Sequence, residues 1–285
     1  MSKPKNDAGL DPGLYFVATP LGNARDITLR ALDVLRAADV LAAEDTRTLR
    51  HLMEIHGIDL RGRRIVAYHD HSKDRDRAAL ISGLEKGLSV AYASEAGTPL
   101  IADPGFALGR AAIEAGHKVW PVPGPSAVLA ALTASGLPTD RFTFAGFPPS
   151  AIGARRKFLE GLSGVPGTLV LYESPRRLGA TLDAASETLG PDRDAAICRE
   201  LTKKFEEVRR GTLDALADFY RDMAPKGEIV LCIGEGQTVV DPVELEAALR
   251  NAMKTQRLKD AAREVADQFG VSRRELYQMG LGFDQ

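Results

Sequence analysis

The sequence predicts an α/β protein with two α/β domains that face a common cleft and a helical extension at the C-terminal end. Three observations support this prediction. Short apolar runs alternate with amphipathic stretches in the first part of the chain, strand-like runs with few helices follow, and the last part is helical throughout. We therefore expect an N-terminal parallel domain at 13–122, a mixed domain at 123–237 and a helical tail at 238–285.

The first domain shows five strand-like runs, at 14–18, 40–43, 65–68, 90–93 and 119–122. Helical patterns lie between them, and in the first of these Leu29, Leu32 and Leu35 share one face. We expect Asp26 to cap that helix. Glycines stand where later helices should end, at Gly57, Gly87 and Gly116. This alternation predicts a parallel, doubly wound sheet, in which a ligand binds at the carboxyl ends of the strands.

The second domain combines more strands with fewer helices. Strand-like runs lie at 142–144, 168–172, 195–198, 207–210 and 228–233. Only two clear helical patterns, at 177–189 and 213–223, separate them. With so few crossover helices, the sheet must include antiparallel pairs. The two cysteines, Cys198 and Cys232, lie in apolar runs, so we expect buried, reduced thiols.

The tail is predicted to form a helix-turn-helix. One helix has an apolar face, made of Leu258, Ala261, Ala262, Val265, Ala266 and Phe269. Gly270 breaks that helix, and Ser272 with Glu275 forms a capping-box pattern for the next. Residues 250–285 hold seven Lys or Arg against five Asp or Glu. Nucleic-acid binding and simple packing on a neighbouring surface explain this tail equally well.

Composition limits the class of protein. Of the 285 residues, 44% are hydrophobic and 27% are charged, which excludes a disordered or fibrous chain. No stretch approaches the roughly 18 consecutive apolar residues of a membrane helix, and the first residues lack the apolar core of a signal peptide. We expect a cytoplasmic protein without membrane contact. The formal net charge is −2, so any nucleic-acid binding must depend on local basic patches.

The loops after the predicted strands are the most unusual part of the sequence. Residues 94–105 hold two glycines and two prolines, which fix a shape that brings the backbone close to a ligand. Residues 123–127, Pro-Gly-Pro-Ser-Ala, place Ser126 at a helix N-terminus. The signatures G-x-G-x-x-G, H-E-x-x-H, G-x-S-x-G and that of the P-loop are absent from the sequence. These loops predict a ligand site without the usual redox, zinc or serine-hydrolase chemistry.

Eight motifs occur in order: Thr-Pro-Leu-Gly-Asn at 19–23, Glu-Asp-Thr-Arg at 44–47, Ala-Gly-Thr-Pro-Leu-Ile at 96–101 with Asp-Pro-Gly at 103–105, Pro-Gly-Pro-Ser-Ala at 123–127, Phe-Ala-Gly-Phe at 144–147, Tyr-Glu-Ser-Pro at 172–175, Arg-Glu-Leu-Thr-Lys at 199–203 and Lys-Gly-Glu at 226–228. On these motifs the chain resembles the ribosomal RNA small subunit methyltransferase I family of the tetrapyrrole methylase superfamily. The resemblance runs from Gly13 to Met279. Two positions depart from it, because Glu95 stands where the family usually has Asp and Ala102 where it usually has Ser.

The resemblance implies a tetrapyrrole-methylase-like fold, with S-adenosylmethionine held in the cleft between the two α/β domains. It also implies a homodimer and no metal. The implied reaction is 2′-O-methylation of a decoding-centre cytidine, cytidine 1402, of 16S ribosomal RNA, as naked RNA or in the small ribosomal subunit. Methyl transfer mainly requires alignment of oxygen, methyl and sulfur, so the shape of the site matters more than reactive side chains.

The family's site residues map onto this chain position by position. The implied cofactor-binding residues are Glu95, Gly97, Thr98, Pro99, Ile101, Ser126, Ala127, Tyr172, Thr202 and Gly227. We expect RNA contacts from Glu44, Asp45, Arg47, Arg176, Arg199 and Lys204. Asp45 could equally be a helix cap. A 2′-hydroxyl is a weak acid, so a base or a cation would assist its reaction, and Lys203, tuned by Glu200, is the candidate for this catalytic role.

Two other functions compete with this interpretation. A tetrapyrrole C-methyltransferase or a protein methylase similar to diphthine synthase would share the fold and the cofactor. The charged loops and the helix-turn-helix tail argue against a porphyrinoid pocket. A non-catalytic RNA-binding or assembly protein would keep the fold without the cofactor, and S-adenosylmethionine binding distinguishes it from an enzyme.

Overall fold

The computed structural model describes residues 9–69, 74–236, 242–269 and 271–284. Its chain forms two compact units, one up to Glu235 and one from Gly236 onward.

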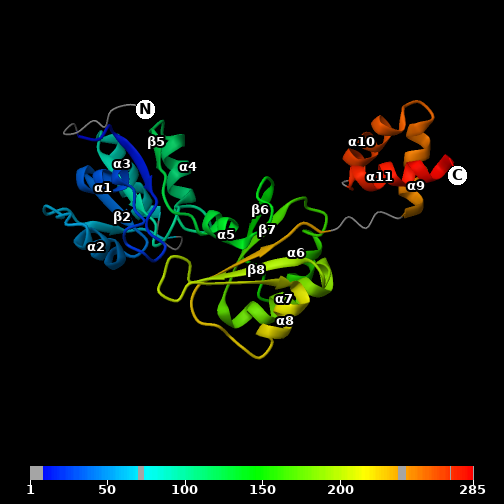
Figure 1. Ribbon diagram of the computed structural model, residues 1–285. Helices are drawn as coiled ribbons and strands as arrows, with labels where there is room; N and C mark the ends of the chain where they lie inside the picture. The colour runs from blue at the N-terminus through cyan, green and yellow to red at the C-terminus, as the bar shows by residue number, and fades with distance from the viewer. Residues whose placement is uncertain (1–8, 70–73, 237–241, 270, 285) are drawn as a thin grey trace. The chain divides into compact units, whose positions relative to one another are not determined.

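The first unit begins with a parallel sheet, as predicted (Figure 1). Its strands are β1 (Gly13–Val17), β2 (Val40–Ala43), β3 (Ile65–Ala67), β4 (Ser89–Ala93) and β5 (Val119–Val122). Their order is β3-β2-β4-β1-β5, and every neighbouring pair is parallel. The carboxyl ends of all five strands therefore lie at one edge of the sheet.

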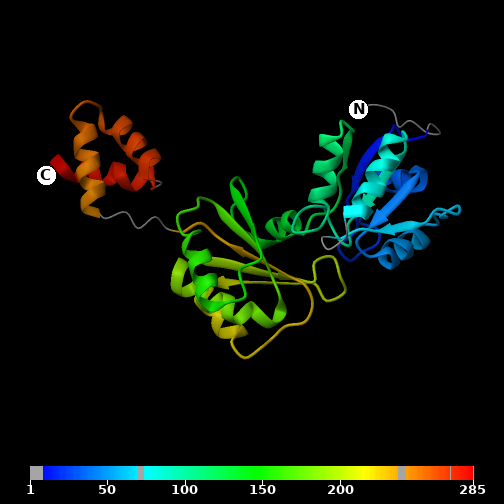
Figure 2. The same ribbon diagram turned by 180° about the vertical axis from the view of Figure 1, so that it is seen from behind.

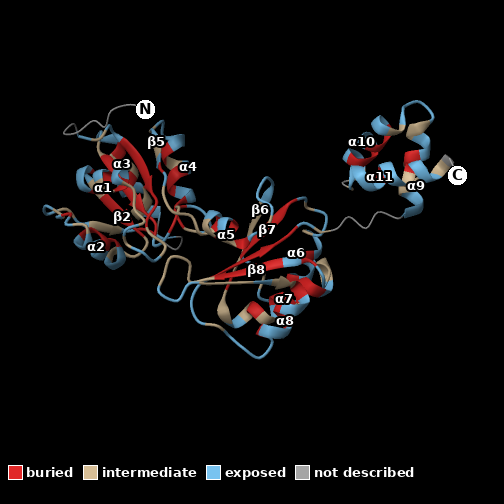
Figure 3. Cartoon of the chain, in the orientation of Figure 1, coloured by how far each residue is buried: buried red, intermediate tan, exposed pale blue. Residues whose placement is uncertain are grey.

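Helices cover both faces of this sheet, which confirms the doubly wound topology. Helices α1 (Leu29–Ala37) and α2 (Thr46–Ile55) pack on one face, and α3 (Asp74–Glu85) and α4 (Phe106–Glu114) pack on the other. Successive strand residues point to opposite faces, so Val17 contributes to one core and Phe16 to the other. Figure 3 shows the strands as buried segments between helices with exposed outer faces.

The predicted cap of α1 is wrong. Thr28, not Asp26, is the N-cap, and its side-chain oxygen accepts a hydrogen bond from the Ala31 N–H at 3.1 Å. Asp26 instead closes a turn, in which its N–H donates to the Asn23 carbonyl at 2.9 Å. The helix therefore starts later, and Leu29 is 81% exposed at its first position. The predicted helix ends are confirmed, because the expected glycines all have positive φ angles: Gly57, Gly87 and Gly116.

Helix α5 (Ala127–Ser135) leads into a second, mixed sheet, as predicted. Its strands are β6 (Phe142–Gly146), β7 (Thr168–Glu173), β8 (Asp194–Arg199), β9 (Glu207–Thr212) and β10 (Ile229–Ile233). The order is β6-β7-β10-β8-β9, with β6 and β7 parallel and the remaining pairs antiparallel.

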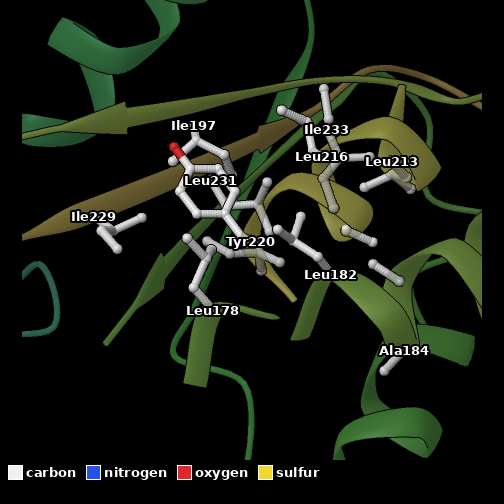
Figure 4. Close-up of a cluster of buried hydrophobic side chains, with 14 of the residues drawn as sticks. Leu178, Leu182, Ala184, Ile197, Leu213, Leu216, Tyr220, Ile229, Leu231 and Ile233 are labelled. Atoms are coloured by element: carbon white, nitrogen blue, oxygen red, sulfur yellow. The ribbon is translucent and has the colours of Figure 1, made fainter. Parts of the chain in front are cut away.

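The second sheet has one helix more than the sequence predicted. Besides α7 (Leu178–Leu189), its preceding turn η1 (Pro175–Arg177) and α8 (Leu213–Tyr220), the chain forms α6 (Ile152–Glu160). A basic run conceals the apolar face of α6, because Arg155 is itself buried and donates to the carbonyls of Pro149 and Ser150. These helices pack on one face of the sheet around the apolar cluster of Figure 4, and α5 packs on the other face.

The second unit contains α9 (Pro242–Met253), α10 (Leu258–Phe269), α11 (Arg273–Leu281) and the turn η2 (Gly282–Asp284). Its core includes four residues of the predicted face of α10: Ala261, Ala262, Val265 and Ala266. Ser272 caps α11 as predicted, since its hydroxyl accepts from the Glu275 N–H at 3.4 Å. The predicted break at Gly270 lies outside the described residues. Within the part of the chain that the structure describes, no helix is long and apolar enough to cross a membrane.

Candidate functional site

A cavity of about 780 Å³ lies wholly within the first unit. The loops after β1, β2, β4 and β5 form one wall, and β7, β8 and β10 contribute the other. Those loops start at the carboxyl ends of parallel strands, where the sequence predicted a ligand site. The lining residues are Thr19–Gly22, Ala24, Glu44, Thr48, His51, Leu52, Ile55, Glu95–Thr98, Ile101–Pro104, Ser126, Ala127, Phe147, Tyr172–Pro175, Cys198, Leu201 and Gly227–Val230.

Hydrogen bonds join three of the loops into one wall. Thr19 and Gly97 exchange both backbone hydrogen bonds at 3.0 Å. The Ser94 hydroxyl donates to the Gly97 carbonyl at 2.5 Å, and the Thr98 hydroxyl donates to the Pro125 carbonyl at 2.8 Å. The loops after β1, β4 and β5 are thus tied to one another, which fixes the shape of this side of the cavity before any ligand binds.

The loop after β4 has an unusual backbone. Gly97 has a φ of 80°, and Leu100 and Ala102 have φ angles of 73° and 56° although they carry side chains. A left-handed conformation costs a non-glycine residue roughly 1–2 kcal/mol. Such strain persists where the surrounding structure enforces it, and it clusters at functional sites. This loop is therefore a strong candidate for ligand binding.

The N-terminus of α5 also opens onto the cavity. Ser126 is the N-cap of this helix and accepts from the Leu129 N–H at 3.5 Å, and Ala127 is its first residue. Both line the cavity. A helix N-terminus carries a partial positive charge and free backbone N–H groups, so it suits a carboxylate or another polar acceptor of a ligand.

Tyr172 lies on the opposite wall, at the end of β7. Its half-buried ring makes edge-to-face contacts with Phe144 and Phe147, at centroid distances of 4.8 and 5.4 Å. Burial, followed by the charges of Asp103 and Glu228, raises the pKa of Tyr172 to about 12. The hydroxyl therefore stays protonated near neutral pH and can donate a hydrogen bond into the cavity.

Carboxylates make the cavity electronegative. Glu44, Glu95 and Glu228 all line it. Although the Glu95 side chain remains accessible to solvent, partial burial and then the charges of Glu44, Asp45 and Glu228 raise its pKa. These acids repel one another through a partly desolvated space, and a cationic ligand would relieve that repulsion.

Lys203 lies in the loop between β8 and β9, where its ammonium donates to the carboxylates of Glu200 and Glu228, both at 3.0 Å. Partial burial favours the neutral amine, but the hydrogen bonds to the two carboxylates outweigh it and raise the pKa of Lys203. The Glu228 N–H and then Lys203 lower the pKa of Glu200. Of the two roles expected for Lys203, base or cation, this geometry favours the cation.

Figure 2 shows that the same loop extends toward the part of the first unit that contains the parallel sheet. The Asn23 N–H donates to the Thr202 hydroxyl at 3.3 Å. A side chain at Gly22 would place its Cβ 2.1 Å from Cγ of Lys203, and one at Gly227 would place it 2.4 Å from the carboxyl carbon of Glu200. Glycine is therefore needed at both positions for the loop to close on its neighbours.

Most of the residues expected to bind the cofactor come together. Eight of the ten line the cavity: Glu95, Gly97, Thr98, Ile101, Ser126, Ala127, Tyr172 and Gly227. Pro99 is buried within the same loop as Gly97, and Thr202 lies in the loop of Lys203, but neither lines the cavity. Gly22 and Glu228 were not assigned from the sequence, although both belong to motifs that carry the resemblance.

The residues expected to contact RNA are spread more widely, and Glu44 is the one that lines the cavity. Asp45 is the N-cap of α2, where it accepts from the Arg47 N–H at 2.8 Å. The Arg47 guanidinium also pairs with Asp45 at 2.9 Å, and this contact lowers the pKa of Asp45 to about 2. The alternative role of Asp45 as a cap is therefore confirmed, while the Arg47 side chain is 90% exposed.

Arg199 is directed away from the cavity. It pairs with Glu207 at 3.0 Å, donates to the Lys226 carbonyl at 3.1 Å and lines a separate small groove. The neighbouring Cys198 points to the other face and lines the cavity, as strand alternation requires. Arg176 and Lys204 are exposed to solvent. Within the described residues, no group of three or more potential metal ligands is arranged around one point.

Comparison with known proteins identifies the family. The model of the tetrapyrrole (corrin/porphyrin) methylases matches residues 13–217, and that of the RsmI C-terminal HTH domain matches residues 239–282. The chain is 51% identical to ribosomal RNA small subunit methyltransferase I of Mesorhizobium japonicum, over 94% of this chain and 91% of that protein. The chain belongs to this family of tetrapyrrole methylases. A second member, from Escherichia coli O157:H7, is 41% identical over 94% of each chain.

Solved structures agree on the fold. Uroporphyrin-III C-methyltransferase from Thermus thermophilus has a TM-score of 0.56 at 24% identity, covering 79% of this chain and 94% of its own. Diphthine synthase has a TM-score of 0.60 at 17% identity, covering 78% of this chain and 89% of its own. At these identities the likeness concerns the fold alone. The predicted fold, the predicted family and the methyltransferase class of enzyme are confirmed.

Proposed function

We propose that this chain transfers a methyl group from S-adenosylmethionine to the ribose 2′-oxygen of cytidine 1402, in the decoding centre of 16S ribosomal RNA. The observation that carries the proposal is the 51% identity to a ribosomal RNA small subunit methyltransferase I over nearly the whole chain. The cavity supports it, because the loops at the strand ends gather most of the residues that the family resemblance assigns to the cofactor.

The cavity fits S-adenosylmethionine in size and charge. Its volume of about 780 Å³ lies within the roughly 300–1,000 Å³ usual for ligand pockets. The sulfonium carries a positive charge, and Glu44, Glu95 and Glu228 give the cavity the opposite sign. A uroporphyrin-III C-methyltransferase of the same fold has been solved in complex with S-adenosyl homocysteine. The bound cofactor supplies an electrophilic methyl group whose leaving group is a neutral thioether.

The residues of the cavity hold and orient the cofactor. Gly97, Thr98 and Ile101 present the strained loop to it, and Glu95 provides charge complementarity. Ser126 and Ala127 offer the N-terminus of α5 to a polar group. Tyr172 and Gly227 form part of the opposite wall. Pro99 and Thr202 do not line the cavity and contribute by fixing the conformation of their loops. Such preorganisation supplies much of the rate of an in-line displacement.

As the 2′-oxygen bonds to the methyl carbon, the carbon–sulfur bond would break to leave the neutral thioether, and the hydroxyl proton would pass to solvent water. The Lys203 ammonium favours the developing alkoxide electrostatically, and Glu200 with Glu228 holds that ammonium in place. Lys203 is thus a cation and not a proton acceptor. Around the cavity, the exposed side chains of Arg47, Arg176 and Lys204 bind RNA phosphates. Arg199 is not among the phosphate-binding residues of this proposal, because its guanidinium already pairs with Glu207.

The proposal is tested with the purified chain, S-adenosylmethionine and small ribosomal subunits from a strain that lacks the chain. We expect one methyl group per subunit, recovered after nuclease digestion as 2′-O-methylcytidine. Ala127→Trp fills the cavity and should abolish S-adenosylmethionine binding in calorimetry. Leu129→Trp, on the same helix but 55% exposed and outside the cavity, is the matched control. A methyl group found on a base or a protein would contradict the proposal.

A further inference from the structure

Helix α11 of the second unit exposes five side chains on one side: Arg273, Arg274, Tyr277, Gln278 and Leu281. At 3.6 residues per turn these positions fall within an arc of roughly 140°. On the other side, Leu276 is fully buried and Met279 packs against the core of the unit. We call this arc the α11 face.

The α11 face carries positive charge without compensation. Arg273 and Arg274 form no ion pair or side-chain hydrogen bond with another described residue, whereas Arg250 of the same unit pairs with Glu246. Glu275, the acidic residue within α11, lies outside the arc and follows the cap Ser272. The N-terminal end of the helix adds its own partial positive charge beside the two guanidinium groups.

An exposed aromatic ring lies next to these charges. Tyr277 is 40% exposed and follows Arg273 by four residues, so the two side chains are neighbours on the helix surface. Guanidinium groups bind phosphates bidentately, and tyrosine rings stack on unpaired bases. A pair of arginines beside a tyrosine thus matches a nucleotide with its flanking phosphates.

We propose that the α11 face binds RNA at an unpaired nucleotide. Arg273 and Arg274 contact the phosphates, and Tyr277 stacks on the base. The N-terminal residues of the second helix are those that helix-turn-helix proteins direct at nucleic acid. The deep, narrow major groove of duplex RNA does not admit a helix, so a loop or bulge is the matching target. The inference rests on the proposed function for the choice of RNA, and it adds a contact surface on the unit that does not contain the cavity.

The test measures binding of the full chain to a short RNA hairpin with a pyrimidine loop, by fluorescence anisotropy at several salt concentrations. Losing two phosphate contacts in Arg273→Ala/Arg274→Ala should reduce the slope of log K against log salt by about 1.4. Tyr277→Ala should weaken binding about fivefold to a hundredfold, and Tyr277→Phe should restore it. Lys259→Ala/Arg263→Ala removes the same charge from the exposed side of α10 and should leave the hairpin affinity and the salt slope close to those of the unmodified chain.

Three results would overturn the proposal. The first is that the α11 variants bind the hairpin with unchanged affinity and salt slope. The second is that the continuous duplex of the same stem binds as well as the hairpin. The third is that the α11 variants lose binding to assembled small subunits but not to RNA, which would indicate a protein partner. Calorimetry with S-adenosylmethionine on the same proteins separates this proposal from the proposed function, because every α11 variant should keep the cofactor affinity of the unmodified chain.

Discussion

At the scale of single residues, Glu95 stands at a position where the resemblance stated from the sequence implies an aspartate. Partial burial and nearby carboxylates raise its pKa above the ordinary 4.5, so the folded protein holds the proton more tightly than the unfolded chain does. Protonated Glu95 therefore stabilises the folded protein at low pH, and this contribution is lost as the pH rises through the raised pKa of Glu95. A cationic ligand instead favours the deprotonated form of Glu95, because the ligand is attracted by the charge of the carboxylate.

The affinity for S-adenosylmethionine should accordingly rise with pH above 4.5 as Glu95 loses its proton. Calorimetry between about pH 5 and pH 7 measures this rise, with release of a proton on binding. Glu95→Gln should flatten the profile and weaken binding at neutral pH by about threefold to tenfold. Glu95→Asp keeps the charge and serves as the control. An unchanged profile in Glu95→Gln would exclude Glu95 as the titrating group.

Lys203 should act as a cation throughout the physiological range. Its pKa is raised by Glu228 and Glu200 against the effect of burial, so its ion pairs stabilise the protein at neutral pH and are lost only as the pH rises above 10.5. Lys203→Arg should keep most of the turnover, whereas Lys203→Ala should lower kcat about a hundredfold with saturating cofactor. Near-normal turnover of Lys203→Ala would remove the residue from the mechanism. Loss of activity in Lys203→Arg, together with a turnover of the unmodified chain that rises with pH near neutrality, would indicate that Lys203 is a base.

The sequence predicted which loops form the site better than it predicted which side chains in those loops pair with each other. Local motifs indicated Gly97, Ser126 and Tyr172, because glycine, cap and strand-end positions have local signatures. Glu200 was expected beside Lys203, but its second partner, Glu228, has no local signature, since it lies 25 residues away and is brought near by the pairing of β8 with β10. The direction of Arg199 likewise depends on strand register, which a single sequence does not reveal.

At the scale of secondary-structure elements, the ends of α1 offer a direct test of the capping assignment. Thr28→Ala removes the hydrogen bond to the Ala31 N–H and should lower the free energy of unfolding by about 1 kcal/mol. Asp26→Ala should change it by no more than about 0.5 kcal/mol. Denaturant unfolding of the two variants measures both values. A larger loss for Asp26→Ala would mean that the helix begins at the position first expected from the sequence.

The contact of the β8–β9 loop with the first wall depends on Gly22. In Gly22→Ala the new Cβ would overlap Cγ of Lys203 at 2.1 Å, so the loop must shift. We expect a loss of about 1–3 kcal/mol in unfolding free energy and weaker cofactor binding. Gly153→Ala, on α6 with no atom within 4 Å of its new Cβ, is the control and should be neutral or stabilising by up to about 1 kcal/mol. Equal stability and cofactor affinity for both variants would show that this contact is dispensable.

Most of the ten strands were predicted because strands in a buried sheet are apolar runs bounded by turns, and the charged strand β9 lies at the edge of its sheet. Helix α6 was missed because its four charged residues equal its four apolar ones in number and Arg155 occupies a buried position. Burying that guanidinium requires the carbonyls of Pro149 and Ser150, a tertiary feature that helical periodicity does not record. Errors of this kind arise where a polar side chain belongs to the core.

At the scale of the whole molecule, the parallel sheet and the mixed sheet place the strand-end loops around one cavity within the first unit. The tail forms a separate compact unit with its own core. The homodimer and the cytoplasmic location implied by the resemblance and the composition stay predictions. Cofactor binding and the RNA contact of the tail can be measured separately, because one depends on the cavity and the other on the α11 face.

Mass mapping of ribose methylation in small-subunit RNA tests the central claim most directly. The RNA of a strain that lacks this chain is compared with that of its parent, and with that of the same strain carrying the chain or its Ala127→Trp variant. We predict that one 2′-O-methyl group, on cytidine 1402, disappears without the chain, returns with the unmodified chain and does not return with Ala127→Trp. A full set of ribose methylations in the strain without the chain would contradict the account.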